Sequence, residues 1–180
     1  MILKRVVIFI SGGGSNMETL IRAAEAPDFP AEIVAVFSDK ATAGGLEKAR
    51  AAGIARHVFE RRDYGSKAAH EDAILAALDQ LKTDILCLAG YMRLLPARFS
   101  APYEGRIINI HPSLLPLFPG LDTHRRALDA GMKVAGCTVH LVTEGVDEGP
   151  ILAQAAVPVR AGDTAETLAA RVLKAEHQLY

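Results

Sequence analysis

Apolar runs and longer amphipathic segments alternate along the first part of this chain, and this alternation limits the folds that it can adopt. The run from Arg5 to Ile10 is continuous and β-branched, which is typical of a parallel strand covered on both faces. Similar short runs occur at residues 33–37, 56–59, 85–89 and 107–110. Helical spacing predicts helices over residues 17–26, 44–52 and 66–81. This order predicts a Rossmann-like α/β fold, with a doubly wound parallel sheet and sites at the carboxyl ends of its strands.

The pattern changes after residue 111. A proline-rich loop and a short helix near residues 124–130 precede two extended runs, 134–142 and 151–159. The turn Glu148-Gly149-Pro150 separates these runs, so we expect an antiparallel pair. A final helix is predicted over residues 163–180, with Asp163 and Glu166 as a capping pair, and Ser66 is the predicted N-cap of the third helix.

We therefore expect a single domain over residues 1–180, whose mostly parallel sheet carries an antiparallel C-terminal extension. Its N-terminal half, residues 1–100, would bind a phosphate or nucleotide, and residues 101–180 would carry the catalytic groups. Helical spacing persists through Leu168, Val172, Ala175 and Leu179 without a terminating glycine. We expect the natural polypeptide to continue past Tyr180.

Charge and composition restrict the classes of partner. The chain has 180 residues, 50% of them hydrophobic, and a formal net charge of −1 without any basic stripe. This distribution argues against nucleic acid or a membrane as the main partner. Cys87 and Cys137 lie inside apolar runs, which favours two reduced thiols in a cytoplasmic protein over a disulfide. The sequence leaves open whether the chain is a monomer or a homodimer.

Asn109 and His111 lie two residues apart where the run at 107–110 ends. Residues at this spacing project from the same side of a strand, and prolines at 112 and 116 stiffen the exit. An amide and an imidazole held together can bind one oxygen atom that gains negative charge during acyl or formyl transfer. The alternative is a capped strand end with a hydrogen-bonded histidine.

An acidic loop could supply a third polar group. Glu144, Asp147 and Glu148 lie in a glycine-punctuated segment at residues 143–150. A solvated turn is the simplest interpretation, but a loop folded over the strand would bring a carboxylate to His111, where it could hold the charged imidazole or accept a proton through water. Spacing alone does not choose among the three acids.

Three consecutive glycines, Gly12 to Gly14, lie between the first predicted strand and helix. Glycines allow close approach of a ligand, and backbone N–H groups at a helix start attract anions. The segment is not a P-loop, and Met17 occupies the third glycine position of the dinucleotide fingerprint. A single phosphate fits better; the alternative is a tight turn.

Other polar residues carry weaker signals. Asp39 has roughly the position of a ribose-binding acid, but a solvated loop is the favoured interpretation. The remaining histidines show no zinc-site spacing, so no metal is expected, and His140 alternates with apolar neighbours as a core histidine does. The segment from Tyr91 to Leu95 offers apolar surface for a flat heterocycle, or simply packs at a helix start.

Several segments together resemble the glycinamide ribonucleotide formyltransferases, a folate-dependent family. They are residues 10–16 (ISGGGSN), 35–40 (AVFSDK), 88–93 (LAGYMR), 108–116 (INIHPSLLP), 119–120 (PG) and 147–150 (DEGP). They cover essentially the whole chain in the family's order. The HPSLLP core and the DEGP loop are shared more widely by enzymes that use 10-formyltetrahydrofolate, whereas the glycine-rich start is typical of those that use the ribonucleotide.

The resemblance implies roles for residues that match the family's motifs. Asn109, His111 and Asp147 match its catalytic trio. Gly13, Gly14, Ser15 and Asn16 match its phosphate cradle for glycinamide ribonucleotide, and Glu176 matches a residue that binds the substrate ribose. The implied site for 10-formyltetrahydrofolate consists of Lys67, Met92, Arg93, Leu94, Leu95 and Asn109, and the resemblance assigns folate binding, together with catalysis, to the half at residues 101–180. Lys67 stands where relatives often carry an arginine, so it keeps the charge and loses the bidentate fork.

The resemblance implies transfer of the formyl group of 10-formyltetrahydrofolate to the amine of glycinamide ribonucleotide, in purine synthesis, without a metal. Three alternatives remain open. A formyltetrahydrofolate hydrolase would use water in place of the amine and would have no use for a phosphate cradle. A nucleotide-dependent oxidoreductase is disfavoured by Met17, and a non-catalytic folate- or nucleotide-binding module is disfavoured by the polar trio.

Overall fold

Strand β1, Lys4–Ile10, lies at the centre of the first part of the molecule and explains its architecture. The computed structural model describes residues 2–180, and the chain divides into two units, one ending at Ile107 and the other spanning Ile108–Tyr180. In the first unit, β1 pairs in parallel with β2 and with β4, and β2 pairs in parallel with β3. The strand order β3-β2-β1-β4 confirms the predicted doubly wound parallel sheet.

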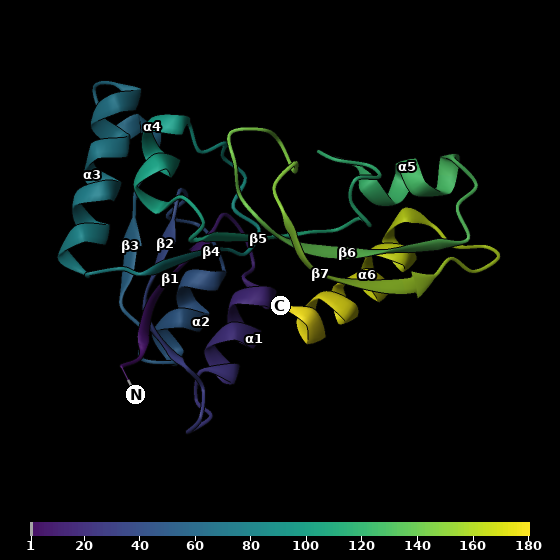
Figure 1. Cartoon of the computed structure of the whole chain (residues 1–180), viewed down its shortest axis with the longest axis horizontal. Coiled ribbons are helices and arrows are strands. Elements are labelled where there is room, and N and C mark those ends of the chain that lie inside the picture. The colour runs from purple at the N-terminus through teal and green to yellow at the C-terminus, as the bar shows by residue number, and fades with distance from the viewer. Residues whose placement is uncertain (1) are drawn as a thin grey trace. The chain divides into compact units, whose positions relative to one another are not determined.

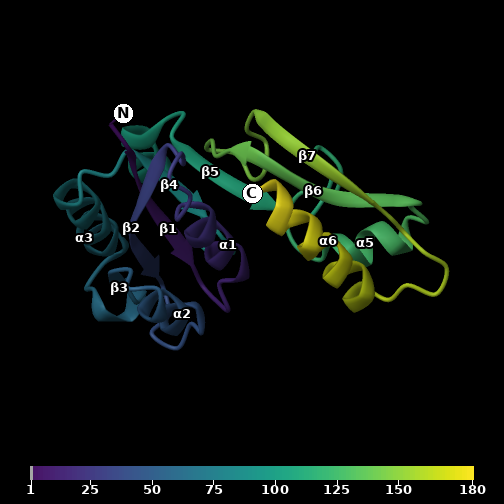
Figure 2. The same cartoon turned by 90° about the horizontal axis from the view of Figure 1, so that it is seen from below.

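Helices cover both faces of this sheet. Figures 1 and 2 show α1 and α2 on one face and α3 on the other. The remaining elements of the unit are β2 (Ala31–Ser38), β3 (Arg56–Val58), β4 (Ile85–Leu88), α1 (Ser15–Ala23), α2 (Gly45–Ala51), α3 (Lys67–Gln80), α4 (Ala97–Ser100) and the 3₁₀ turns η1 (Arg61–Asp63) and η2 (Ala101–Tyr103). Residues 6–10 of β1 are at most 5% exposed, because side chains on both sides of a central parallel strand meet a helix layer.

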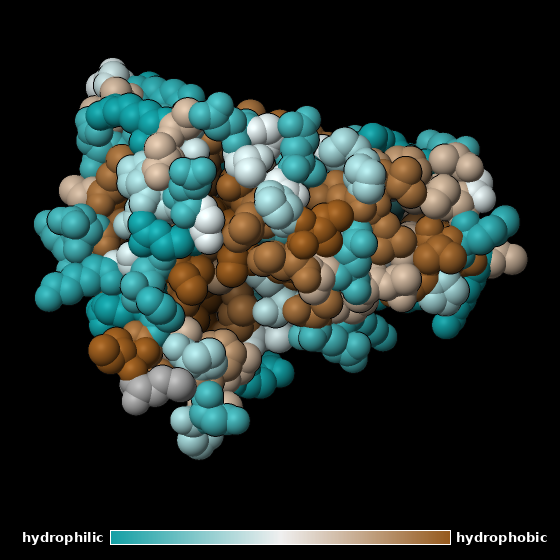
Figure 3. Space-filling model, viewed as in Figure 1, coloured by the Kyte–Doolittle hydropathy of each residue, from teal (hydrophilic) through white to brown (hydrophobic). Residues whose placement is uncertain are grey.

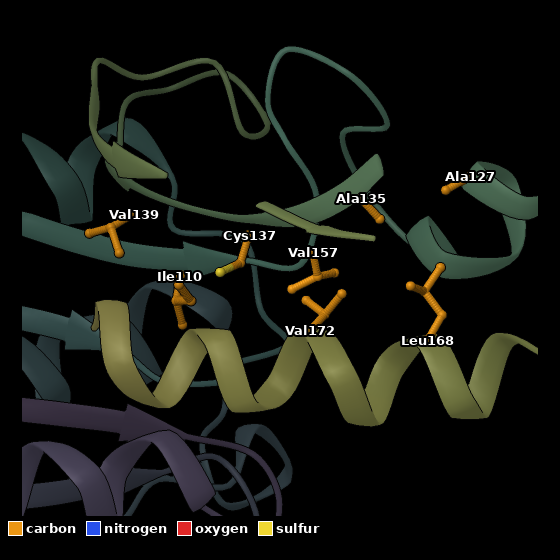
Figure 4. Packing of buried hydrophobic residues seen from close by; sticks show 8 residues of the cluster. All are labelled: Ile110, Ala127, Ala135, Cys137, Val139, Val157, Leu168 and Val172. Carbon is orange, nitrogen blue, oxygen red and sulfur yellow. The ribbon is translucent and has the colours of Figure 1, made fainter. Parts of the chain in front are cut away.

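The second unit is built on antiparallel strands. It contains β5 (Ile107–His111, whose first residue closes the first unit), α5 (Thr123–Asp129), β6 (Val134–Leu141), β7 (Ile151–Pro158) and α6 (Ala165–Leu179). Strand β6 pairs antiparallel with β5 and with β7, which confirms the predicted antiparallel pair. Figure 4 shows α6 packed along these strands, with Leu168 and Val172 among the side chains that fill the space between them.

Helix caps follow the prediction at one helix and depart from it at another. The Ser66 side chain accepts a hydrogen bond from the Ala69 N–H and begins α3, as predicted. The predicted pair of Asp163 and Glu166 at α6 is wrong. Thr164 and Thr167 form the capping box. Both Asp163 carboxylate oxygens instead bind the Arg171 guanidinium, at 2.7 and 2.8 Å.

The surface of the β6–β7 hairpin carries exposed apolar side chains. In Figure 3 brown residues gather over this region, and Val134, Ile151 and Leu152 are each about half exposed. Across residues 2–180, no helix combines the length and the apolar character needed to cross a bilayer.

Candidate active site

Strand β5 ends with two polar side chains, as the sequence predicts. His111 is 5% exposed and Asn109 is partly buried. Across the antiparallel ladder, Asn109 faces His140 and His111 faces Thr138. Strand β6 therefore lies beside both residues, and it supplies the side-chain partner of Asn109.

Asp147 is the acid that reaches His111. Its Oδ2 atom lies 3.2 Å from His111 Nδ1 and accepts a hydrogen bond of 2.8 Å from the Gly120 N–H. Asp147 has a φ of 55°, a left-handed conformation that aspartate tolerates better than most residues. The loop backbone at this position directs the carboxylate to the end of β5. The structure therefore resolves the choice that spacing left open among Glu144, Asp147 and Glu148.

Both ring nitrogens of His111 face hydrogen-bond acceptors. Nδ1 faces the Asp147 carboxylate, and Nε2 lies 3.0 Å from the Phe118 carbonyl oxygen, which can only accept. An imidazole that donates from both nitrogens is an imidazolium. The two acceptors therefore hold the imidazole ring in one orientation at the end of β5.

His140 holds the amide of Asn109 and is a functional candidate that the sequence did not identify. Its Nδ1 atom lies 2.9 Å from the Leu141 carbonyl oxygen, and its Nε2 atom lies 3.2 Å from Asn109 Nδ2. Burial lowers the pKa of His140, so the ring is neutral. Since Nδ1 carries the proton donated to the carbonyl, Nε2 is an acceptor and orients the Asn109 NH₂ group.

The sequence predicted His140 to be a core histidine, and its 2% exposure agrees with that expectation. Its contact with Asn109 was missed because alternation with apolar neighbours does not reveal a cross-strand partner. The signal that could have found it is the register that places residue 140 opposite residue 109.

Hydrogen bonds hold the proline-rich segment after His111. The Ser113 hydroxyl donates to the Leu117 carbonyl at 2.6 Å, and the Thr138 hydroxyl donates to the Ser113 carbonyl at 2.7 Å. Thr138 also accepts from the Leu115 N–H and from the Gln154 amide. Thr138 is fully buried, so the frame around His111 is fixed by paired polar groups rather than by the two prolines alone.

A hollow of about 400 Å³ opens at the glycine-rich turn of the first unit, and we call it the glycine hollow. Gly14 is required by the backbone, because its φ is 69° and an added Cβ would lie 3.0 Å from Gly45 Cα. Gly12 and Gly13 differ, since a Cβ on either would meet nothing within 4 Å. The space beside them is open to a ligand. The hollow is lined by residues 11–16, Lys48, Ala89, Gly90 and Met92.

Charge and helix geometry in the glycine hollow favour an anion. The turn leads into the N-terminus of α1, where backbone N–H groups lack helical partners. Lys48, which the sequence did not single out, adds a cation, and its ammonium lies 2.6 Å from a Glu18 carboxylate oxygen. The structure therefore places Gly13, Gly14, Ser15 and Asn16 together around one hollow.

A second hollow of the first unit, of about 350 Å³, contains the predicted folate residues other than Asn109. We call it the leucine hollow. Met92 and Leu94 are 65% and 76% exposed, so they offer apolar surface to a ligand, and Lys67 Nζ lies 3.8 Å from Glu71 Oε1. The hollow is lined by Arg61, Lys67, His70, Glu71, Ile74, residues 91–96 and Phe99.

Two further residues differ in outcome. Asp39, which the sequence favoured as a solvated loop residue, is 5% exposed and its Oδ2 atom accepts from Arg93 Nε at 2.8 Å; that expectation is wrong. Glu176 is buried on α6. The pKa of the nearby Cys137 thiol is raised to about 11, chiefly by burial of the thiol and further by the negative charge of Glu176.

Within residues 2–180, no group of three or more histidine, cysteine or acidic side chains is arranged to hold a metal ion.

Relatives of known activity resemble the chain over nearly its whole length. It is 49% identical over 176 residues to the bovine trifunctional purine biosynthetic protein adenosine-3, covering 98% of this chain and 17% of that protein. It is 45% identical over 175 residues to the phosphoribosylglycinamide formyltransferase of Escherichia coli, covering 97% of this chain and 82% of that protein. The chain thus spans about one sixth of the trifunctional relatives and most of the bacterial ones.

Solved structures give the same result. The crystal structure of the phosphoribosylglycinamide formyltransferase from Brucella melitensis superposes with a TM-score of 0.95 at 82% identity, covering 98% of this chain and 91% of that one. The sequence profile of the formyl transferase family matches residues 4–180. The predicted α/β formyltransferase fold is therefore confirmed, and the chain belongs to the formyl transferase family.

Proposed function

We propose that this protein is a phosphoribosylglycinamide formyltransferase, which moves the formyl group of 10-formyltetrahydrofolate to the amine of glycinamide ribonucleotide in purine biosynthesis. The bacterial relatives of that name, at 43–45% identity over 97–99% of the chain, support the assignment. The observation that carries it is the contact between His111 and Asp147 beside the oriented Asn109 amide. Such a cluster suits acyl transfer to an amine without a covalent enzyme intermediate.

The substrate phosphate would bind in the glycine hollow. Backbone N–H groups at Gly13, Gly14, Ser15 and Asn16 would donate to its oxygens at the start of α1. Open space beside Gly12 and Gly13 supports this assignment. The substrate ribose would contact Glu176, as the family resemblance implies.

The folate co-substrate would bind in the leucine hollow. Its flat ring system would lie against Met92, Leu94 and Leu95, while Lys67 and Arg93 would pair with carboxylates of its glutamate end. A lysine in place of the family's usual arginine offers one ammonium rather than a planar fork. We therefore assign Lys67 a charge contact and not a bidentate one.

The formyl carbon would be attacked by the substrate amine, giving a tetrahedral intermediate with a negatively charged oxygen. The Asn109 NH₂ group would donate one N–H to that oxygen, because His140 Nε2 accepts the other. The charged His111 ring would supply the second interaction. Donors fixed before the reaction stabilise such charge most effectively.

Proton transfers complete the reaction. Asp147, through a water molecule, would accept the proton that the attacking amine must lose. The intermediate would then break its bond to N10 of the folate, and His111 would return a proton to that nitrogen. Each group would act by general acid–base catalysis within reach of the reacting atoms.

The contact between His111 and Phe118 adds a requirement. Since Nε2 donates to the Phe118 carbonyl, this nitrogen can donate to the substrate only after that contact opens. The segment around Phe118 would therefore shift when the substrates bind.

The proposed reaction requires no metal. The two buried free thiols, Cys87 and Cys137, fit an enzyme of the cytoplasm.

The decisive experiment follows deformylation of 10-formyltetrahydrofolate with and without glycinamide ribonucleotide. We expect turnover only when both are present, with formylated ribonucleotide as the product. Deformylation at the same rate without the ribonucleotide would indicate the hydrolase instead. Absence of deformylation, with binding of either ligand retained, would indicate a binding module.

Two variants test the roles of the polar trio. Asn109→Ala should lower kcat by roughly 10²–10³-fold, the loss typical of an oxyanion-hole donor. Asp147→Asn should lower kcat by roughly 10²–10⁴-fold, the contribution typical of a general acid–base group. Unchanged circular dichroism and thermal midpoints would exclude misfolding as the cause. Near-normal turnover in both folded variants would contradict the mechanism.

A further inference from the structure

Met92 lies between the two substrate hollows of the first unit. Among residues 2–180, it is the only residue that lines both the glycine hollow and the leucine hollow. It is also 65% exposed, so most of its surface is open to whatever enters them. A ligand that fills either hollow therefore meets the same methionine.

Ser11 fixes the backbone at Met92. The Met92 N–H donates to Ser11 Oγ at 2.9 Å, and the Ser11 N–H donates to the Gly90 carbonyl at 3.2 Å. Ser11 is 5% exposed and itself lines the glycine hollow. Residues 89–96 form neither helix nor strand, so these two hydrogen bonds join an irregular segment to the glycine-rich turn, 81 residues away from Met92 along the chain.

The Met92 side chain keeps the freedom that its backbone lacks. A methionine side chain has three rotatable bonds, and ordering it costs conformational entropy. A first ligand that packs against the thioether restricts these bonds. A second ligand in the other hollow then meets a side chain that is already ordered, and it loses less entropy on binding. Two ligands on opposite sides of Met92 therefore favour each other's binding.

We propose that Met92 is a shared wall that couples binding of the ribonucleotide to binding of the folate, and that Ser11 is the positioning residue that holds this wall between the two hollows. This inference rests on the proposed function, which puts one substrate in each hollow. Occupancy of one hollow tightens binding in the other about three- to tenfold, within the rotamer freedom of one methionine. The coupling favours the complex that contains both reactants over a protein with one hollow filled.

Calorimetry tests the coupling without turnover. Unformylated tetrahydrofolate has no group to transfer, so its complex with glycinamide ribonucleotide does not react. In the unmodified protein, saturating tetrahydrofolate should lower the Kd for the ribonucleotide about three- to tenfold. The ribonucleotide should lower the Kd for tetrahydrofolate by the same factor, because coupling between two binding sites is reciprocal. Unchanged Kd values in both directions would overturn the proposal.

Met92 and Leu94 give a matched pair of variants. Both are exposed apolar residues of one segment, at 65% and 76%, but Leu94 lines the leucine hollow alone. Met92→Ala should abolish the coupling. Leu94→Ala should weaken the binding of tetrahydrofolate and leave the coupling factor as it is. Coupling that survives Met92→Ala, or that falls equally in the two variants, would contradict a shared wall at Met92.

Thr83 provides the control for Ser11, because it is another buried hydroxyl of the first unit. Its Oγ1 atom donates to the Leu78 carbonyl at 3.0 Å, and it lines neither hollow. Ser11→Ala removes the acceptor of the Met92 N–H and should reduce the coupling factor about twofold or more, as for one net hydrogen bond. Thr83→Val should leave the factor unchanged. Full coupling in Ser11→Ala would reject the positioning role. A lower thermal midpoint in that variant leaves the result for Met92→Ala decisive for the wall.

Turnover and coupled binding are separate measurements, so the two proposals can fail separately. A protein that transfers the formyl group without any coupling would reject the shared wall and leave the proposed function standing. Coupled binding in a protein without turnover would support the shared wall and reject the transferase. A protein that binds neither ligand would overturn both.

Discussion

Asn109 has two amide hydrogens, and His140 accepts one of them. An isolated asparagine amide can rotate by half a turn and present its oxygen where a donor is needed, which would repel an oxyanion. His140 prevents this because its Nδ1 proton is committed to the Leu141 carbonyl, which leaves Nε2 as the acceptor. His140 is thus a positioning residue for the proposed donor.

Variants of His140 separate positioning from packing. His140→Gln keeps an acceptor near the site of Nε2, whereas His140→Leu fills the space without one. We expect the leucine variant to lose about tenfold or more in kcat, as for a buried group left without its partner, with little change in KM. The glutamine variant should retain more activity at a similar thermal midpoint. Equal kcat values for the two variants would reject the positioning role.

The pH profile gives a second measurement on His140. Burial lowers the pKa of this histidine, so the ring stays neutral below the ordinary histidine value of about 6.5. Protonation in stronger acid would convert Nε2 from an acceptor to a donor and expel the Asn109 amide. The leucine variant should lack this contribution to the acid limb of kcat.

At single residues, the sequence predicted which side chains lie together where their spacing along one strand determines the side from which they project. Asn109 and His111 were identified because they alternate on a strand that ends at a proline. The choice of Asp147 over Glu144 and Glu148 was not available from spacing, since it depends on a left-handed backbone at one loop residue. His140 was assigned to the core correctly, but its partner lies across the sheet, and a single sequence does not give that register.

Within elements, the glycine-rich turn combines two kinds of glycine. Gly14 has a positive φ and close neighbours, whereas Gly13 faces open space. The backbone conformation at position 14 requires glycine, whereas the open space beside Gly13 can admit a ligand. The turn and a phosphate beside it were predicted from the sequence, but the three glycines could not be distinguished there, because backbone angles and spatial neighbours are not visible in a sequence.

Alanine substitutions should separate the two glycines. Gly14→Ala should destabilise the fold by about 1–3 kcal/mol, the usual cost of holding a side chain in a disfavoured backbone region. Gly13→Ala should leave the free energy of unfolding nearly unchanged and raise KM for glycinamide ribonucleotide more than KM for the folate. Denaturant titration and steady-state kinetics measure the two effects. An increase confined to the folate KM would contradict the phosphate assignment.

Helix α6 provides a matched pair of leucines for stability. Leu168 is fully buried in the core of the second unit (Figure 4), whereas Leu173 is 37% exposed. Leu168→Ala should cost about 2–5 kcal/mol of unfolding free energy, because it removes transfer energy and leaves a cavity. Leu173→Ala should cost less than about 1 kcal/mol. Similar losses in urea denaturation would show that α6 packs differently.

Element boundaries were predicted less well than element types. The run at residues 33–37 predicted β2, but the strand extends over Ala31–Ser38 because its hydrogen-bond ladder continues past the apolar residues. Helix α4 was missed, since four residues are too short to show a helical period. The capping pair of α6 was misassigned because Asp163 binds Arg171, a partner two turns away.

At the scale of the whole molecule, composition predicted what kinds of partner to expect but not which substrates. Near-neutral net charge and interspersed signs argued against nucleic acid. Substrate identity came from motifs that match a family. The cluster of Lys40, Arg61, Arg62 and Arg93 was not predicted, because positions 40, 61–62 and 93 lie far apart along the chain and meet only in the folded unit.

The absence of a metal remains a prediction for the whole protein. We expect dialysis against EDTA to leave kcat and the thermal midpoint unchanged, because histidine, cysteine and acidic side chains show no ligand spacing in the sequence. Added Zn²⁺ or Mg²⁺ should not raise turnover after dialysis. A loss of activity that one of these ions restores would contradict the prediction.

The proposed catalytic groups and the proposed phosphate site belong to different units, and this has a consequence for the evolution of substrate preference. The proposed transfer groups Asn109, His111, His140 and Asp147 all belong to the unit spanning Ile108–Tyr180, while the glycine hollow belongs to the other. A lineage could therefore exchange one formyl acceptor for another by altering the glycine turn, and inherit the transfer chemistry intact. Chimeras joined near residue 107 would reveal whether acceptor preference travels with the first unit.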